Sequence, residues 1–253
     1  MDQNKTPVKA TATSVRVIDA LIQLDGGTVT ELEDHLDLSK SSIHNHLETL
    51  KMLGFVVRDG WCYRVSLRFL QIGGLACRQH PLYEIGLPIV RQLATSSGLV
   101  ASLIVVERSE AICLHSSIGT KDEYTFPEVG DTLPLHSTAP GKALLAAMPP
   151  EQVDSILDIS SLDAETENTL TSREALEEEL QKVSSRRLAF DREEWRIGVR
   201  GIATTILDAD DDLIGAICVT SSVDSMSGKR FQQDIPGMVI SSANKIRKAL
   251  RKT

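Results

Sequence analysis

Apolar residues near the N-terminus recur at helical spacing. Residues 14–24 carry one apolar stripe that stops before Gly26, a residue type that favours helix ends. Thr30, with Glu33 three positions later, matches a capping box and predicts a short second helix that ends at Leu36. The pattern therefore predicts two helices followed by a turn.

A third helix is predicted after Ser39, which has the residue type of an N-cap. Ile43, Leu47 and Leu50 fall on one side of this helix, and Gly54 ends it. The second and third helices, joined by a tight turn, have the spacing of a helix-turn-helix.

Two strand-like runs follow, at residues 55–58 and 61–65. The Asp59-Gly60 pair between them is a strong hairpin signal. Three helices and a hairpin predict a winged helix-turn-helix domain over residues 1–65.

The polar side of the third helix carries short hydrogen-bonding side chains rather than the Glu and Lys of an ordinary solvated face. Such a face can approach base edges in a major groove, and two hairpin arginines can meet phosphates beside it. The predicted DNA-binding residues are Lys40, Ser41, Ser42, His44, Asn45, Thr49, Arg58 and Arg64. Each residue type also has an ordinary explanation when taken singly. The serines could cap the helix, the histidines could simply lie on the surface, and the arginines could pair with the acidic helices. The arrangement as a whole favours DNA binding.

The remainder of the chain alternates helical and strand-like patterns. Residues 66–80 predict a linker helix, apolar on more than one side, that packs against its twin in a dimer or within its own chain. Further elements are expected as strands at 99–106, 111–117, 129–135, 188–192, 199–207 and 213–221, and as helices at 85–97, 141–148, 151–157, 173–186 and 231–251. Hairpin-joined strands bracketed by helices indicate an α+β fold with a mainly antiparallel sheet in an effector domain over residues 81–253.

Composition narrows the class of protein. The 253 residues suffice for two domains, and no apolar run reaches the length of a membrane span. The polar N-terminus is unlike a secretory signal, so a cytoplasmic location is expected. The four cysteines lack paired CxxC spacing, and His44 and His46 point to different sides of a helix, so neither a metal nor a cofactor is predicted.

The net charge of −8 is unevenly distributed. The first 75 residues hold eight basic and nine acidic groups, and the acidic excess belongs to the rest of the chain. Residues 19–37 carry six acidic side chains and no Lys or Arg, whereas residues 39–68 carry five basic and two acidic ones. The net charge therefore does not argue against DNA binding by the third helix and hairpin.

One predicted turn has residues of types that can bind a ligand. Thr138 to Gly141 precede an apolar helical run, and the free N–H groups of such a turn favour an anion such as a carboxylate. Lys142 would add a positive charge, although an ordinary capped helix start explains the same residues. Asp191 follows a predicted strand, in a loop position common for binding residues.

From Ser14 to about Leu250 the sequence resembles the IclR family of bacterial and archaeal transcriptional regulators. The most telling segments are residues 41–50, residues 135–146 and residues 191–203. The resemblance implies a winged helix-turn-helix, a linker helix and a GAF/profilin-like effector domain. It also implies a homodimer or homotetramer that binds double-stranded operator DNA and a small organic effector, often a carboxylate, a sugar-derived acid or an aromatic acid.

The resemblance also implies where the effector binds. Motif by motif, the family's contacts fall on Ala139, Pro140, Gly141, Asp191, Gly201, Cys218 and Thr220. Pro140 lacks an N–H, Gly201 stands where a Cys is common, and Cys218 stands where a Ser is common. These departures argue against a simple two- or three-carbon acid.

The sequence favours a ligand-responsive transcriptional regulator, either repressor or activator, of a catabolic pathway. Catalysis is not expected, because the GxSxG, GxxxxGK[ST] and HExxH motifs are absent from the sequence. The alternative that stays open is a ligand sensor or adaptor without DNA binding, which the acidity of residues 19–37 supports.

Overall fold

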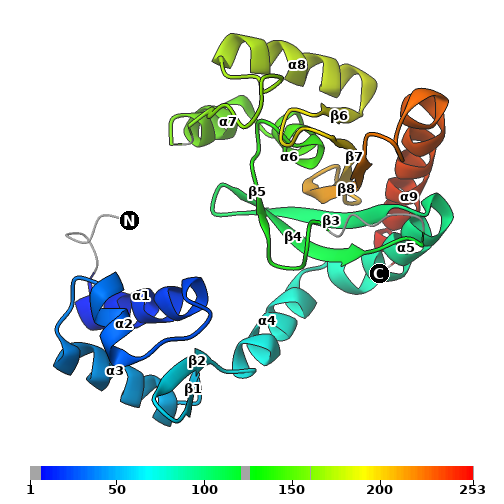
Figure 1. Ribbon diagram of the computed structural model, residues 1–253. Helices are drawn as coiled ribbons and strands as arrows, with labels where there is room; N and C mark the ends of the chain where they lie inside the picture. Colours follow the sequence, from blue (N-terminus) through cyan, green and yellow to red (C-terminus); the bar gives the residue numbers. More distant parts are fainter. Residues whose placement is uncertain (1–6, 121–125, 160, 253) are drawn as a thin grey trace. The chain divides into compact units, whose positions relative to one another are not determined.

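The computed structural model describes residues 7–120, 126–159 and 161–252. The chain forms two compact units, one up to Cys77 and one from Arg78 onward. Figure 1 follows the elements of both units in chain order, from blue to red.

The N-terminal unit begins with α1 (Lys9–Gln23), α2 (Val29–His35) and α3 (Lys40–Met52). Their apolar faces meet in one core, in which Ile43, Leu47 and Leu50 of α3 are buried as predicted. The N-cap prediction for α3 is also confirmed, because the Ser39 hydroxyl accepts a hydrogen bond from the N–H of Ser42.

The predicted capping box at Thr30 and Glu33 is wrong by two residues. Thr28 is the N-cap of α2: its hydroxyl accepts from the N–H of Glu31 at 3.3 Å, and the Glu31 carboxylate accepts from the N–H of Thr28 at 2.7 Å. The sequence holds two overlapping boxes. The earlier one forms because the neighbouring Gly27 is fixed by paired backbone bonds to Tyr63 of the hairpin.

The predicted hairpin is present as β1 (Val56–Asp59) and β2 (Cys62–Val65), paired antiparallel. Asp59 and Cys62 are the last paired residues, so Gly60 and Trp61 make a two-residue loop. Gly60 has a φ of 60°, the left-handed conformation that the Asp-Gly signal anticipates.

Helix α4 (Arg68–Gln79) follows the hairpin. Its first turn is fixed to the hairpin, because the guanidinium of Arg68 donates to the carbonyl oxygen of Leu53 and lies 4.5 Å from the ring centre of Phe55. Its apolar side chains are largely exposed, among them Leu67 just before it and Leu70 and Leu75 within it.

The second unit is built on one antiparallel sheet, as predicted. In the part of the chain that the structure describes, its strands are β3 (Val100–Glu107), β4 (Glu110–Ser117), β5 (Thr132–Leu133), β6 (Ala189–Arg192), β7 (Val199–Leu207) and β8 (Leu213–Ser222), in the spatial order β5-β4-β3-β8-β7-β6. Each neighbouring pair is antiparallel.

Helices cover both faces of this sheet. They are α5 (Leu82–Ser97), α6 (Ala139–Leu145), α7 (Pro150–Leu157), α8 (Arg173–Arg186) and α9 (Ile235–Leu250). Gly86 of α5 faces Leu103 of β3, whereas the next residue, Ile104, belongs to the cluster that contains α6. Because successive strand residues point to opposite faces, α5 and α6 lie on opposite sides of the sheet, as Figure 1 shows.

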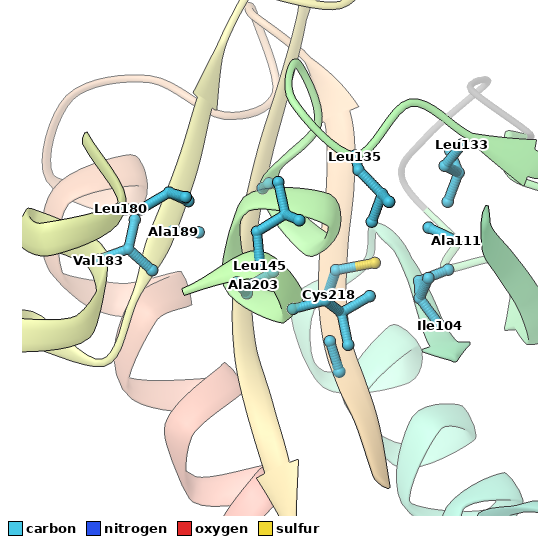
Figure 2. Packing of buried hydrophobic residues seen from close by; sticks show 14 of the residues in the cluster. Ile104, Ala111, Leu133, Leu135, Leu145, Leu180, Val183, Ala189, Ala203 and Cys218 are labelled. Carbon is cyan, nitrogen blue, oxygen red and sulfur yellow. The ribbon is translucent and has the colours of Figure 1, made fainter. Parts of the chain in front are cut away.

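The main core lies between the sheet and α6 and α8. Figure 2 shows side chains of α8 and of β3, β6, β7 and β8 meeting around Leu145, with Cys218 of β8 among them. Leu176, Leu144 and Ala203 are fully buried in the same cluster. This packing fixes α6 against the strands that carry the predicted effector residues.

Several predicted elements differ in extent. The helices expected over 14–24 and 141–148 are Lys9–Gln23 and Ala139–Leu145. The strand expected over 129–135 is reduced to Thr132–Leu133, because Gly130 adopts a φ of 94° and turns the chain before it. The long closing helix starts with a π-helical turn, Arg230–Asp234, before α9 proper.

Gly141 of α6 is required by close packing. A Cβ at this position would lie 2.4 Å from the carbonyl oxygen of Leu135 and 2.5 Å from its Cα. Only glycine lets the helix approach this strand-like segment so closely.

We expect Gly141→Ala to lower the free energy of unfolding by about 1 to 3 kcal/mol, because backbone atoms must shift to admit the methyl group. Gly237→Ala is the matched control, since a Cβ at this position in α9 meets no heavy atom within 4 Å among the described residues. The free energy of unfolding of this control should rise by up to about 1 kcal/mol, because alanine has a higher helix propensity than glycine. Urea unfolding of both variants measures the contrast, and equal effects would contradict the close-packing argument.

Candidate functional site

The outer face of α3 is polar and open. Ser41, Asn45 and Thr49 occur at every fourth position of the helix and are all exposed, as is His44 beside them. The Thr49 hydroxyl donates to the carbonyl oxygen of Asn45 at 2.8 Å, so it is already partly engaged by the helix backbone. The amide of Asn45 stands at the centre of this row.

The remaining predicted residues of α3 have partial structural roles. Lys40 forms an exposed ion pair with Glu33 of α2 at 3.3 Å. Ser42, half-buried, gives its backbone N–H to the N-cap Ser39. His46 turns inward and its Nδ1 lies 2.9 Å from the hydroxyl of Ser14, which agrees with the two histidines of α3 not sharing a ligand.

The hairpin arginines lie on opposite faces of the wing. Arg58 pairs with Tyr63 and Arg64 with Val57, so the two alternate across the strands. The Nε of Arg58 donates to the carbonyl oxygen of Gly60 at 2.8 Å, and its guanidinium lies 5.3 Å from the ring centre of Trp61. Both arginines are exposed, and within the described residues neither is in an ion pair.

The second unit gathers most of the predicted effector residues in one cavity, here called the effector cavity. Its wall combines the entry of α6 with strands β6, β7 and β8. The predicted residues in the wall are Ala139, Pro140, Asp191, Gly201, Cys218 and Thr220. Thr138 of the predicted ligand-binding turn also lines it, and the sequence predictions missed four further lining residues, Phe126, Pro127, Leu133 and Trp195.

Aromatic side chains cover this cavity. The rings of Phe126 and Trp195 lie 4.6 Å apart between centres, and the guanidinium of Arg196 lies 3.9 Å from the Trp195 ring. The volume open to the centre of a water molecule is only about 10 Å³, about enough for one water. An effector therefore enters only if the covering side chains move.

More of the backbone N–H groups at the start of α6 are hydrogen-bonded than the sequence pattern suggests. The hydroxyl of Thr138 accepts from the N–H of Gly141 at 3.1 Å, and its carbonyl oxygen accepts from the N–H of Lys142 at 3.0 Å. Gly141 packs on Leu135 and, among the described residues, does not belong to the cavity wall. Of the N–H groups at this turn, that of Gly141 is therefore not free for an anion, and neither is that of Lys142, which follows it.

Lys142 does not face the effector cavity as an open charge either. Its side chain is fully buried and forms an ion pair with the carboxylate of Glu194. The same Glu194 donates its backbone N–H to Oδ1 of Asp191 at 2.8 Å. Lys142 and Glu194 thus form a buried ion pair that is linked to Asp191 in the cavity wall.

The carboxyl group of Asp191 is only 2% exposed. Burial raises its pKa to about 7, and the charge of Glu194 adds to this, against the hydrogen bond from the Glu194 N–H and the charge of Lys142. The ordinary pKa of an aspartate is about 3.9. Near neutral pH the group therefore exchanges between a hydrogen-bond donor and an acceptor at the cavity wall.

Within the described residues no group of three or more His, Cys, Asp or Glu side chains has the arrangement of a metal site. In the same residues, no helix is long and apolar enough to cross a membrane.

A winged helix-turn-helix, in the same chain as an α+β domain with a small, mainly apolar cavity that includes Asp191 in its wall, is the arrangement of a DNA-binding regulator with an effector domain. Comparison with known families agrees: residues 12–60 match the IclR helix-turn-helix domain, and residues 75–248 match the bacterial transcriptional regulator IclR C-terminal domain. The chain belongs to the IclR family of DNA-binding transcriptional regulators, which are not enzymes.

Similar proteins cover nearly the whole chain. A probable HTH-type transcriptional regulator ArcR of Halobacterium salinarum is 29% identical over 91% of this chain and 89% of its own length. The transcriptional repressor IclR of Escherichia coli is 28% identical over 94% of this chain and 89% of its own length. An IclR homologue of Microbacterium hydrocarbonoxydans, solved with 4-hydroxybenzoate, superposes with a TM-score of 0.82 at 21% identity, over 96% of this chain and all (100%) of that one.

The buried carboxyl group makes stability depend on pH. Because the folded-state pKa of Asp191 is raised, its contribution to stability is fully present below about pH 4 and is lost as the pH rises through about 7. Asp191→Asn cannot titrate, so its free energy of unfolding relative to the wild type should rise with pH over this window, by at most about 1.4 kcal/mol per unit.

Denaturant unfolding between these pH values measures the difference. Asp224→Asn, at an exposed carboxylate, is the control and should show a pH-independent difference. A flat profile for Asp191→Asn would show that Asp191 stays ionised over the whole range.

Proposed function

We propose that this chain is a ligand-responsive regulator whose helix α3 reads operator DNA and whose effector cavity binds a small organic acid. The observation that carries the proposal is the open polar row of Ser41, Asn45 and Thr49, opposite a fully apolar buried face. An exposed row of this kind fits the major groove, where amide and hydroxyl groups can bond base edges.

The remaining predicted DNA contacts follow from that placement. Lys40, Ser42 and His44 flank the row, and Arg58 and Arg64 of the hairpin offer guanidinium groups to phosphates. Because the two arginines lie on opposite faces of the wing, each would meet a different part of the DNA backbone. The acidic residues of α2 do not neutralise either arginine within the described structure.

The active form is proposed to be a homodimer or homotetramer. Leu67, Leu70 and Leu75 are each at least half exposed at helix α4, in an arrangement suited to a second copy of the chain. A two-fold dimer would place its reading helices on half-sites about 34 Å apart, or a multiple of that distance. A cytoplasmic location fits contact with operator DNA.

The effector is proposed to be a carboxylate or sugar-derived acid larger than two or three carbons, and the regulated genes those of a catabolic pathway. The aromatic cover and the apolar Cys218 of the wall favour a ligand with an apolar portion, and a structural neighbour was solved with 4-hydroxybenzoate. Asp191, near half protonation at neutral pH, could donate a hydrogen bond to the carboxylate. Ala139, Pro140, Gly201 and Thr220 would shape the remainder, and Gly141 would act only by positioning α6.

Two substitutions should separate base reading from phosphate contact. Asn45→Ala should lower the preference for the cognate base at one operator position by about 1 to 3 kcal/mol. Arg58→Ala should weaken binding to all sequences alike and reduce the slope of log affinity against log salt by about 1. Gel-shift titrations on a selected operator and on scrambled DNA, at several salt concentrations, measure both.

Arg108→Ala, an exposed arginine of the second unit, serves as the charge control and should change neither quantity. If Lys40→Glu combined with Arg64→Glu leaves promoter occupancy in cells unchanged, the chain is a sensor or adaptor without DNA binding. If occupancy is lost instead, mapping of the genomic sites that the wild-type chain binds identifies the regulated genes, whose products point to the effector.

A further inference from the structure

The second unit contains a larger cleft that the proposed effector role does not use. We call it the edge cleft; it lies among α6, α8, α9 and β7 and has a volume of about 460 Å³. Small-molecule sites usually measure about 300 to 1,000 Å³. The effector cavity, by comparison, opens only about 10 Å³ to the centre of a water molecule.

The cleft exists because an edge strand is short. Strand β6 pairs with β7 only as far as the register Ala189 to Ala203, and beyond it no strand of the described residues pairs with this side of β7. Thr204, Thr205 and Leu207 therefore line the cleft along an open strand edge. Such an edge presents backbone hydrogen-bonding groups together with the Thr205 hydroxyl.

One wall of the edge cleft is apolar and made of small side chains. Ala143 lies in α6, Ala146 is its C-cap and Ala147 follows it, and Ile240 faces the cleft from α9. Alanines leave room that larger residues would fill. An apolar molecular body can therefore lie against this wall.

The charges of the edge cleft leave one cation uncompensated. Arg186 is paired with Glu179 at 2.6 Å, and Arg247 is paired with Asp211. Arg187, exposed at the end of α8, lines the cleft and has no ion-pair partner within the described residues. Its carbonyl oxygen accepts from the Thr204 hydroxyl at 2.7 Å, which fixes the backbone from which the guanidinium extends.

We propose that the edge cleft is a second small-molecule site, separate from the effector cavity, that binds an organic monocarboxylate with an apolar body. The carboxylate pairs with Arg187, whose planar guanidinium suits bidentate contact, and Asn244 supplies a further hydrogen-bonding side chain. The single uncompensated positive charge favours a monoanion over a phosphate dianion. The apolar body of the ligand lies against Ala143, Ala146 and Ala147.

Isothermal titration of the full chain with octanoate and with benzoate tests the proposal. Arg187→Gln should weaken binding of the better probe by about tenfold or more, because the charge-assisted pair is lost. Ala147→Leu, which keeps every charge and fills the cleft from an exposed position, should weaken it to a similar extent.

Arg108→Gln is a closely matched control. Like Arg187, Arg108 is exposed and has a left-handed backbone, with φ values of 53° and 55°. Its loss removes the same charge but should leave binding at the wild-type value. Melting temperatures of all variants, measured in parallel, separate a loss of binding from a loss of fold.

Three results would overturn the proposal. The first is the absence of saturable binding of either probe below about 10 mM, an affinity too weak for a site. The second is wild-type binding by both Arg187→Gln and Ala147→Leu, which would reduce Arg187 to a cation that stabilises the end of α8. The third is loss of binding in Gly201→Val, which fills the effector cavity, with no loss in the edge-cleft variants.

Discussion

The ion pair between Lys142 and Glu194 is the constraint on which the geometry of the second unit depends. The Lys142 side chain is fully buried, and an isolated charge in that position would cost several kcal/mol of desolvation. Its only charged partner among the described residues is Glu194, on the loop between β6 and β7. The entry of α6 and this loop must therefore stay together for either charge to be tolerated.

The same loop is fixed from other directions. The carbonyl oxygen of Glu194 accepts from the hydroxyl of Thr169 and its N–H bonds Asp191, while the next residue, Trp195, stacks on Phe126. The side chain of Glu194 thus holds α6, while its backbone groups and the adjacent Trp195 hold Asp191 and the aromatic cover. Helix α6 links the two sites, because its first residues line the effector cavity while Ala143 and the residues just after the helix line the edge cleft.

Local patterns in the sequence predict the elements well and their contacts less well. Helix α8 and strand β7 were predicted to the residue, since their apolar periodicity is uninterrupted and their ends carry clear signals. The error at α2 arose because two capping boxes overlap, and a long-range bridge between Gly27 and Tyr63 selects one of them. Local helix propensity alone therefore does not determine which of the two capping boxes forms.

For the candidate site too, the sequence predicted several residues but not the contacts between distant parts of the chain. Motif resemblance brought six of the predicted residues to one cavity wall, yet it missed Phe126 and Trp195, which are adjacent only in space. Lys142 was likewise predicted from the turn residues to be an open charge, because its partner lies 52 residues away in sequence. A Trp that directly follows the Glu-Glu pair was the one signal that sequence offered for the aromatic cover.

The aromatic cover also has a kinetic meaning. Since the cavity beneath Phe126 and Trp195 has room for about one water, binding is gated by an opening step of the protein itself. The observed dissociation constant then equals the intrinsic one divided by the fraction of molecules that are open. At high effector concentration the rate of binding to this cavity then levels off at the rate at which the cover opens.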